Sequence, residues 1–361
     1  MKRNLEMYLE GIKPACKEAA AAARERADSL IKPPGSLGRL EDYAVKLAGI
    51  TGSIKNGPLK KCVLIMCSDN GVVDEGVAAA PQEITLAMAA NFVKGTTGAA
   101  VLAKHFGADI RVFDVGINSD VKLPGVTDRK IKKSTGNIAL GPAMSRAEAE
   151  QAILAGIEAA ESAKNDGYQI LGAGEMGIGN TTTTTAILSA LTGLPARSIT
   201  GAGAGLTPSA HEKKILTVDA AVKINAANAS DPVDLTAKLG GFDIAAMTGV
   251  YIGAAHCGLP VVADGYISAA AAYLAVMFNE KIRDYLFLSH VSEEPGYLHY
   301  MRLLGMEAPL CLNMRLGEGS GCPLMFAVID AACAALNNMA TFGEALAGSG
   351  EEYLNNISGA E

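Results

Sequence analysis

Short runs of apolar residues that end in small or polar residues recur along the chain, with helical patterns between them. The clearest runs are Cys62 to Gly71, Ile110 to Ile117, Tyr168 to Gly177, Pro260 to Tyr266 and Tyr285 to Ser292. Each has the length of a buried strand. The helical segment 145–165 opens on a Ser cap, with Glu148 three residues later. This alternation predicts an α/β fold with a doubly wound, mostly parallel sheet of the Rossmann type.

The two ends of the chain differ from this middle. Residues 1–50 show helical patterns broken by Lys32 to Arg39, and Cys322 to Leu346 reads as one helix with little strand character. We therefore expect an α/β core over residues 56–325. Residues 1–55 and 326–361 should together form a small helical domain.

One segment has to be weighed as a membrane span, because Ile244 to Val262 carries no formal charge. Glycines and Pro260 interrupt it, and Asp243 and Asp264 bracket it closely. A buried helix followed by a buried strand explains it better. The N-terminus also lacks the apolar core of a signal peptide. We expect a soluble, cytoplasmic protein that inserts into no membrane.

Composition and residue spacing argue against nucleic-acid binding, disulfide bonds and a metal site. The net charge of −7 gives no support to nucleic-acid binding. The seven cysteines form no CxxC pair and the five histidines no HxxxH pair, so we expect reduced thiols and no dedicated metal site.

In open parallel sheets, ligands bind beyond the carboxyl ends of the strands. The polar residues that follow the predicted strands should therefore surround one crevice: Asp69-Asn70-Gly71, Asp114, Gly174-Glu175, Asp264-Gly265 and Ser289-His290. The alternative is that several of them are helix caps and turn formers. Residue pattern alone leaves both interpretations open.

Three glycine-rich turns, in segments 171–186, 200–214 and 315–323, are candidates for chemistry. Glycines let the backbone approach a ligand and turn N–H groups toward phosphate oxygens. Two of the turns also hold a glutamate, Glu175 and Glu318. A glutamate there either favours the helix dipole or acts as an accessible general base. For Glu318 we favour the base.

The chain resembles the nicotinate-nucleotide–dimethylbenzimidazole phosphoribosyltransferase family, which activates the lower ligand of cobalamin. Blocks that match the family run nearly end to end: KPPGSLGRLE (32–41), DNGVVDEGV (69–77), PQEIT (81–85), NFVKGTTGAAVLAK (91–104), GEMGIGNTTTTTA (174–186), GGFDIAAMTGVY (240–251), DGYISAAAA (264–272), SHVSEEPG (289–296) and RLGEGSG (315–321). Long blocks in this order are highly specific.

The resemblance implies that the protein transfers phosphoribose from nicotinate mononucleotide to an aromatic base, with no metal or redox cofactor. Glu318 would be the catalytic base, with a pKa near the ordinary value. The implied donor-binding residues are Glu175, Gly177, Ile178, Gly179, Asn180, Thr181, Gly203, Lys214 and Ser292; the adjacent Lys213 is an alternative to Lys214. The amides of residues 177–180 would face phosphate and ribose. The implied acceptor pocket comprises Ala78, Ala80, Gln82, Met176 and Leu316.

The sequence departs from the family at this acceptor pocket. Ala78 and Ala80 stand where the family usually has serine and tyrosine, and Asn70 stands where it has histidine. We therefore expect relaxed acceptor choice, which extends to phenol or p-cresol. The resemblance also implies a dimer, either of identical subunits or with a homologous subunit.

Two alternatives belong to other classes. The chain could be a weakly active or regulatory subunit, although it retains both glutamates and the glycine turns. A nicotinamide-dependent oxidoreductase would require an acidic residue about 20 residues after its glycine-rich turn, and the chain has no Asp or Glu between Glu175 and Glu212.

Overall fold

The computed structural model describes residues 4–203 and 205–345. They divide into two compact units: the chain up to Pro14 together with Lys60–Phe326, and Ala15–Leu59 together with the chain from Ala327 on. Residues 346–361 of the predicted C-terminal helical segment lie outside the described residues.

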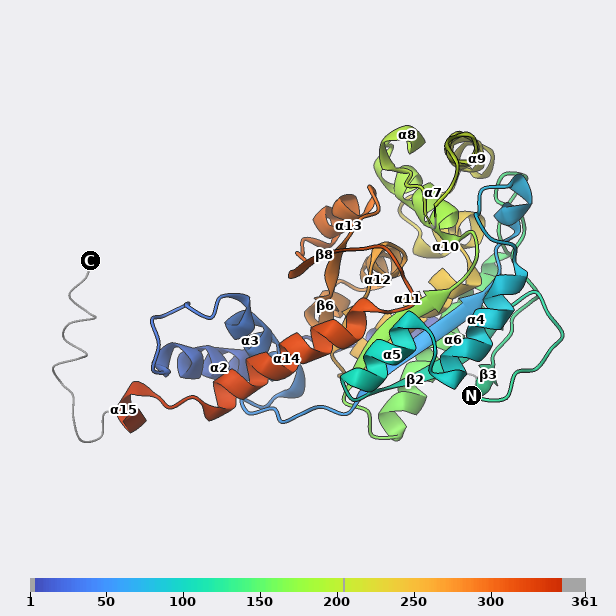
Figure 1. Cartoon of the computed structure of the whole chain (residues 1–361). Helices are drawn as coiled ribbons and strands as arrows, with labels where there is room; N and C mark the ends of the chain where they lie inside the picture. The colour runs from blue at the N-terminus through green and yellow to red at the C-terminus, as the bar shows by residue number, and fades with distance from the viewer. Residues whose placement is uncertain (1–3, 204, 346–361) are drawn as a thin grey trace. The chain divides into compact units, whose positions relative to one another are not determined.

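A six-stranded sheet forms the centre of the first unit (Figure 1). Every pair of neighbouring strands in it is parallel. In spatial order the strands are β3 (Val126–Asp128), β2 (Ala108–Gly116), β1 (Lys61–Ser68), β4 (Ile170–Met176), β5 (Val261–Ala263) and β6 (Leu286–Leu288). This order confirms the predicted doubly wound α/β class. From β1 the next strands are added on one side of the sheet, and from β4 they are added on the other, so the topological switch point lies between β1 and β4.

Two differences from the sequence-based strands have a physical cause. The predicted strand 285–292 divides at Ser289 into β6 and β7 (His290–Ser292), which pairs with β8 (Leu310–Met314) in a separate two-stranded sheet. Strands β3 and β8 were not predicted. Both are short and largely exposed: β3 has three residues, and β8 has five, including the apolar stretch 310–312 that the sequence analysis did not select.

Helices connect the strands of the first unit. They are α1 (Leu5–Glu10), the 3₁₀ turn η1 (Gly71–Glu75), α4 (Glu83–Lys94), α5 (Gly98–His105), α6 (Arg146–Asn165), α7 (Asn180–Thr192), α8 (Ala196–Ile199), α9 (Pro208–Asn225), α10 (Pro232–Leu239), α11 (Phe242–His256), α12 (Tyr266–Phe278), the 3₁₀ turn η2 (Glu280–Tyr285) and α13 (Tyr297–Leu304).

Helix α1 belongs to this unit, although the sequence grouped it with the helical ends. Its Tyr8 hydroxyl donates to Glu161 of α6, and the Tyr8 ring contacts His256 of α11 edge-on. These contacts hold the first residues on the α/β core.

Helices α6 and α11 pack tightly because glycines face each other's backbone. A Cβ on Gly156 would lie 1.8 Å from the Ala246 carbonyl oxygen, and one on Gly249 would lie 1.9 Å from the Ile153 carbonyl oxygen. Helix α11 and β5 are almost wholly buried, which confirms that segment 244–262 is a buried helix followed by a buried strand.

Within the described residues, two stretches are long and apolar enough to cross a membrane: 83–105 and α14 (Gly321–Asn338). The first is two helices, α4 and α5, separated at Gly95, which has a left-handed φ of 77°. Half of the window in α14 is buried in protein. A core helix passes the same test, so these stretches are weak evidence for a span.

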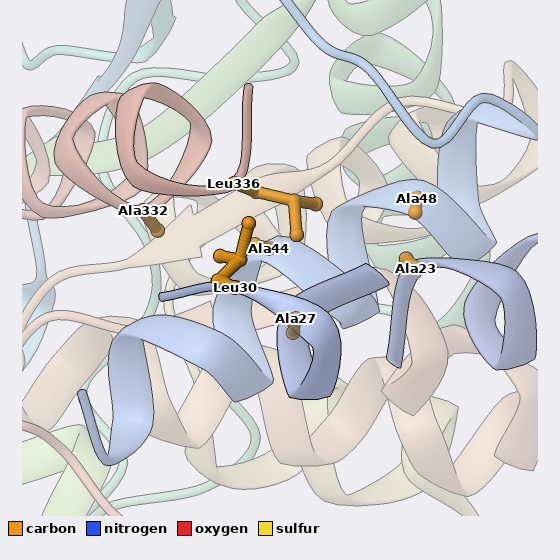
Figure 2. Packing of buried hydrophobic residues seen from close by; sticks show 7 residues of the cluster. All are labelled: Ala23, Ala27, Leu30, Ala44, Ala48, Ala332 and Leu336. Atoms are coloured by element: carbon orange, nitrogen blue, oxygen red, sulfur yellow. The ribbon is translucent and has the colours of Figure 1, made fainter. Parts of the chain in front are cut away.

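The second unit consists of α2 (Lys17–Ser29), α3 (Arg39–Thr51), the later part of α14 and α15 (Phe342–Ala345). Small and aliphatic side chains from α2, α3 and α14 form its core (Figure 2): Ala23, Ala27, Leu30, Ala44, Ala48, Ala332 and Leu336. Glu41, which is buried, pairs with Lys32 at 2.8 Å and accepts from the Leu37 N–H. This pair fixes the exposed Pro33–Ser36 turn.

Candidate active site

A cavity of about 310 Å³ lies in the first unit, next to the carboxyl ends of β4 and β5. It is lined by residues from segment 77–80, α4, segment 175–181, Ala202, Gly203, Leu206, α9 and segments 264–268, 290–294 and 315–318. All the predicted site residues except Gln82 are in this lining. Most of these residues were named from the family resemblance, and the position of the cavity agrees with the rule that ligands bind beyond the carboxyl ends of parallel strands.

The rule was less selective for the other polar residues. Asp264 and His290 line the cavity, but Asp69, Asn70 and Asp114 do not. Asp114 instead accepts from the Gly116 and Ile117 N–H groups and pairs with Lys130. It is a turn former, the alternative that the sequence left open.

Gln82 is directed to another cluster. Its side-chain amide donates to the Asn70 carbonyl oxygen at 3.0 Å, and its Oε1 accepts from Asn118 at 3.0 Å. Both ends of the side chain therefore connect loops beside the cavity, and the structure gives Gln82 no place in the lining.

Glu318 lies in a turn of unusual backbone geometry. Gly317, Glu318 and Gly319 all have left-handed φ angles, of 80°, 64° and 80°. For the glutamate this conformation costs about 1–2 kcal/mol. Its carboxylate accepts from the Ala99 N–H, at the start of α5, at 3.1 Å. Burial raises the pKa of Glu318 by more than the hydrogen bonds from the Ala99 and Gly98 N–H groups lower it. The pKa therefore lies above the ordinary value that we expected.

Glu175, 7% exposed, lies at the end of β4 and contacts the same turn. Its Oε1 accepts from the Glu318 N–H at 3.2 Å, and its Oε2 accepts from the Asn180 amide. The same Asn180 nitrogen donates to Asp243 at 2.9 Å. Burial, reinforced by the charge of Asp243, raises the pKa of Glu175 to about 8. Because it is mostly protonated at neutral pH, Glu175 does not repel an anion from the glycine-rich turn.

A buried ammonium group provides positive charge. Lys214, 1% exposed, donates to the Thr181 hydroxyl at 2.9 Å and to the Gly201 carbonyl oxygen at 3.1 Å. Burial lowers its pKa to about 8. Gly203, at φ 57°, lets the backbone pass close to this nitrogen. Of the two adjacent lysines, Lys214 lies in the cavity lining and Lys213 does not.

The amides of the 177–180 turn are only partly directed as the resemblance implies. The Ile178 N–H donates to the Thr85 hydroxyl at 3.3 Å, and the Asn180 N–H donates to the Gly177 carbonyl oxygen at 3.1 Å. The N–H groups of these two residues are therefore engaged in hydrogen bonds within the protein. The start of α7 behind Gly179 still directs its positive end toward the turn.

Another part of the lining is apolar. It comprises Val77, Ala78, Ala79, Ala80, Ile84, Met88, Met176 and Leu316. None of these side chains carries a hydroxyl. Ile84 and Met88, four residues apart on one face of α4, were missed by the sequence analysis. So were Tyr266, Glu294 and Arg315, although all three stand in or beside the quoted blocks.

The described part of the chain contains no group of three or more His, Cys, Asp or Glu residues that could hold a metal ion. The lining thus combines an ammonium group, a buried carboxylate in a glycine turn and an apolar wall. Such a site can bind an anionic nucleotide beside an aromatic ring and move a proton.

The comparisons with known proteins agree among themselves. A family model described as phosphoribosyltransferase matches residues 12–346. A relative from Clostridium perfringens is 53% identical over 340 residues, which cover 94% of each chain. One from Ruminiclostridium cellulolyticum is 50% identical and covers 94% of this chain and 97% of its own. Both are named nicotinate-nucleotide–dimethylbenzimidazole phosphoribosyltransferase.

A solved structure gives the same result in three dimensions. The crystal structure of the enzyme of that name from Thermus thermophilus has a TM-score of 0.87 and 39% sequence identity to this chain. The match covers 93% of this chain and all of the other.

Proposed function

The chain belongs to the nicotinate-nucleotide–dimethylbenzimidazole phosphoribosyltransferase family, and from this we propose how its cavity transfers phosphoribose from nicotinate mononucleotide to a lower-ligand base for cobamide assembly. The observation that carries the proposal is the lining itself, in which Lys214, Glu318 and an apolar wall share one cavity. The products are nicotinate and the α-riboside 5′-phosphate of the base.

The chemistry exchanges one bond for another at C1′ of the ribose. The ring nitrogen of the acceptor forms a bond to C1′ from the face opposite nicotinate, and the bond between C1′ and the nicotinate nitrogen breaks. That nitrogen leaves as a neutral pyridine because it was a pyridinium in the donor. The acceptor loses its N–H proton. No electrons are transferred.

We assign the proton transfer to Glu318. Its carboxylate lines the cavity, and a pKa raised by burial makes the ionised form a stronger base. General-base catalysis is typically worth about 10²–10⁴-fold, so Glu318→Gln should lower kcat by about 10²-fold or more. Nicotinate mononucleotide should bind the variant as before, as measured by calorimetry. Glu158→Gln, on the exposed face of α6, serves as the control.

Donor binding is assigned to the residues around Lys214. We propose that its ammonium group holds the phosphate, together with Thr181, Gly203 and Ser292. A charge-assisted hydrogen bond of this kind is worth about 1.5–3 kcal/mol. Glu175, when protonated, lines the part of the cavity that takes the nicotinate ring.

We further propose that this enzyme accepts a wider range of aromatic acceptors, including phenol and p-cresol. Hydroxyl groups from serine and tyrosine would orient a benzimidazole and penalise, by about 1–3 kcal/mol each, an acceptor that left them unpaired in a buried site. At Ala78 and Ala80 neither the contact nor the penalty exists. An acceptor with a single heteroatom can then compete.

The test is a competition between dimethylbenzimidazole and p-cresol with the purified chain, read as the ratio of the two ribotide products by mass spectrometry. A preference for dimethylbenzimidazole of about a thousandfold, or 4 kcal/mol, would exclude the wider range. The variant Ala78→Ser/Ala80→Tyr should shift the ratio toward dimethylbenzimidazole. Ala87→Ser, exposed on α4 and outside the lining, should leave it unchanged. Turnover by the single chain also excludes a purely regulatory subunit.

Assembly and location complete the proposal. We propose a cytoplasmic dimer, with a second copy of this chain or a homologous subunit as the partner. Ile84 and Leu316, which line the cavity, are 39% and 56% exposed, and a partner subunit would cover apolar surface of this kind. Light scattering of the purified chain measures the state directly.

A further inference from the structure

The turn that carries Glu318 needs external support. Three successive residues with left-handed φ angles are unusual, and the central one is not glycine. Such a conformation persists only where the surroundings fix it. The Ser320 N–H closes the turn on the Gly317 carbonyl oxygen at 3.0 Å, but this single bond does not orient the turn against the sheet.

Asp264 supplies the orientation. Its Oδ2 accepts from the Gly319 N–H at 3.0 Å, and its Oδ1 accepts from the Gly321 N–H at 2.6 Å. The carboxylate thus holds the turn on the side that follows Glu318, while Glu175 accepts from Glu318 itself. The two oxygens of this one carboxylate therefore satisfy both N–H groups.

Asp264 is itself fixed. It follows β5 directly, is 2% exposed, and its own N–H donates to the Ser268 hydroxyl of α12 at 3.0 Å. The turn is also pressed onto the sheet, because a Cβ on Gly174 of β4 would lie 2.6 Å from the Glu318 carbonyl oxygen. The sheet therefore determines, through Asp264, where the turn lies.

We propose that Asp264 is a positioning residue for the catalytic base: by accepting the Gly319 and Gly321 N–H groups, it holds Glu318 in the left-handed conformation that keeps its carboxylate in the cavity lining. The inference rests on the proposed role of Glu318. It assigns to Asp264 a role through the turn and no contact with substrate.

The variant Asp264→Asn tests this with almost no change in volume. Its amide offers one acceptor oxygen and turns an NH₂ group toward the second N–H, so the turn loses a bond and gains a donor–donor conflict. We expect kcat to fall about 10- to 100-fold, within the range of general-base catalysis. The Kd of nicotinate mononucleotide should stay within about twofold. In the Glu318→Gln background the same change should have no further effect on kcat.

Asp114→Asn is the matched control, because Asp114 also accepts two backbone N–H groups but lies outside the cavity lining. It should keep kcat and Kd. The proposal is overturned if Asp264→Asn keeps its kcat, if the losses are equal in both backgrounds, or if donor affinity falls in step. Absence of transfer by the parent chain would instead contradict the proposed function.

If Asp264→Asn does not fold, Asp264→Ser replaces it, since a hydroxyl can accept one N–H without presenting an NH₂ group. Hydrogen exchange of the parent chain is an independent measurement. The amides of residues 319 and 321 should exchange as slowly as those of β4. Exchange as fast as in an unfolded peptide would overturn the proposal.

Discussion

Burial shifts the pKa values of the acidic and the basic side chains in the cavity in opposite directions. It raises the pKa of Glu175 to about 8 and lowers that of Lys214 to about 8. Both groups are thereby closer to neutrality at physiological pH than in water. The ammonium group of Lys214 keeps its positive charge only below its own pKa, which gives the proposed donor binding a measurable pH dependence.

The first prediction concerns this lysine. Its ammonium charge is lost as the pH rises through about 8, so kcat/KM for nicotinate mononucleotide, which reports the free enzyme, should decrease with rising pH. For a single group of this pKa the decrease between pH 8 and pH 9 is about fivefold. Initial rates at subsaturating donor measure it.

Lys214→Ala provides the control for that measurement. It should bind the donor more weakly at every pH, and it should keep only the part of the pH dependence that comes from the ionisation of Glu175. Lys213→Ala, whose side chain lies outside the cavity lining, should behave like the parent. A flat profile for the parent from pH 7 to pH 9 would show that the phosphate is held by backbone groups.

At this scale, the sequence could predict which residues meet but not how they are bonded. Glu318 stands in one of the family blocks, and Lys214 stands at the end of the glycine-rich segment 200–214. Whether Gln82 enters the cavity depends on the loop at Asn118, which lies far along the chain. Asp264 accepts hydrogen bonds from the Gly319 and Gly321 N–H groups, which point toward it only in the folded turn. No local pattern carries such information.

At the scale of elements, close helix packing shapes the core beneath the site. The glycines that interrupt segment 244–262 argued against a membrane span, and the structure shows what they do. Gly249 of α11 lies against the Ile153 backbone of α6, and Gly156 of α6 lies against the Ala246 backbone. Helix α11 in turn carries Asp243, which holds Asn180 beside Glu175.

The second prediction follows from this contact. Gly249→Ala places a methyl group within 1.9 Å of the Ile153 carbonyl oxygen, where backbone cannot move aside easily. We expect a loss of about 1–3 kcal/mol in the free energy of unfolding, measured by urea denaturation. Gly141→Ala, at a glycine with open space around it, should change stability by less than about 0.5 kcal/mol. Equal stability of the two variants would mean that α6 and α11 separate without cost.

The sequence predicted elements where burial made them apolar. The runs that it selected became β1, β2, β4, β5 and the pair β6 and β7. It could not show that Ser289 divides the last run between two sheets, because both halves are buried and read as one strand. The exposed strands β3 and β8 gave no periodic signal at all.

At the scale of the whole molecule, the buried carboxyl groups determine how stability varies with pH. Burial raises the pKa of Asp243 to about 6 and that of Glu175 to about 8. In the unfolded chain these groups titrate near pH 4. The folded protein therefore holds more protons than the unfolded chain in the window between, and its stability falls as the pH rises through it.

The third prediction is that the melting temperature decreases by several degrees from pH 6 to pH 8.5. A loss of about 1 kcal/mol corresponds to roughly 2–4 °C in a domain of 150–250 residues. Lys214 and His290, whose pKa values burial lowers, act in the opposite direction but are fewer. Scanning calorimetry of the parent and of Glu175→Gln measures the effect.

The variant identifies the group responsible. Glu175→Gln removes the carboxyl group with the highest pKa, so the melting temperature should decrease less toward pH 8.5. A melting temperature that rises over this range, or an identical slope in the variant, would show that these carboxyl groups remain ionised in the folded state.

The two ends of the cavity come from different connections of one sheet. Ala78 and Ala80 stand between β1 and β2, whereas Thr181, Gly203 and Lys214 stand between β4 and β5. Under the proposed assignment of roles, mutations in the first connection change the acceptor and leave the donor-binding residues intact. An ancestral enzyme of this architecture could acquire a new lower ligand without passing through an inactive intermediate. Exchanging residues 77–88 between relatives of different acceptor choice would retrace that history in a single step.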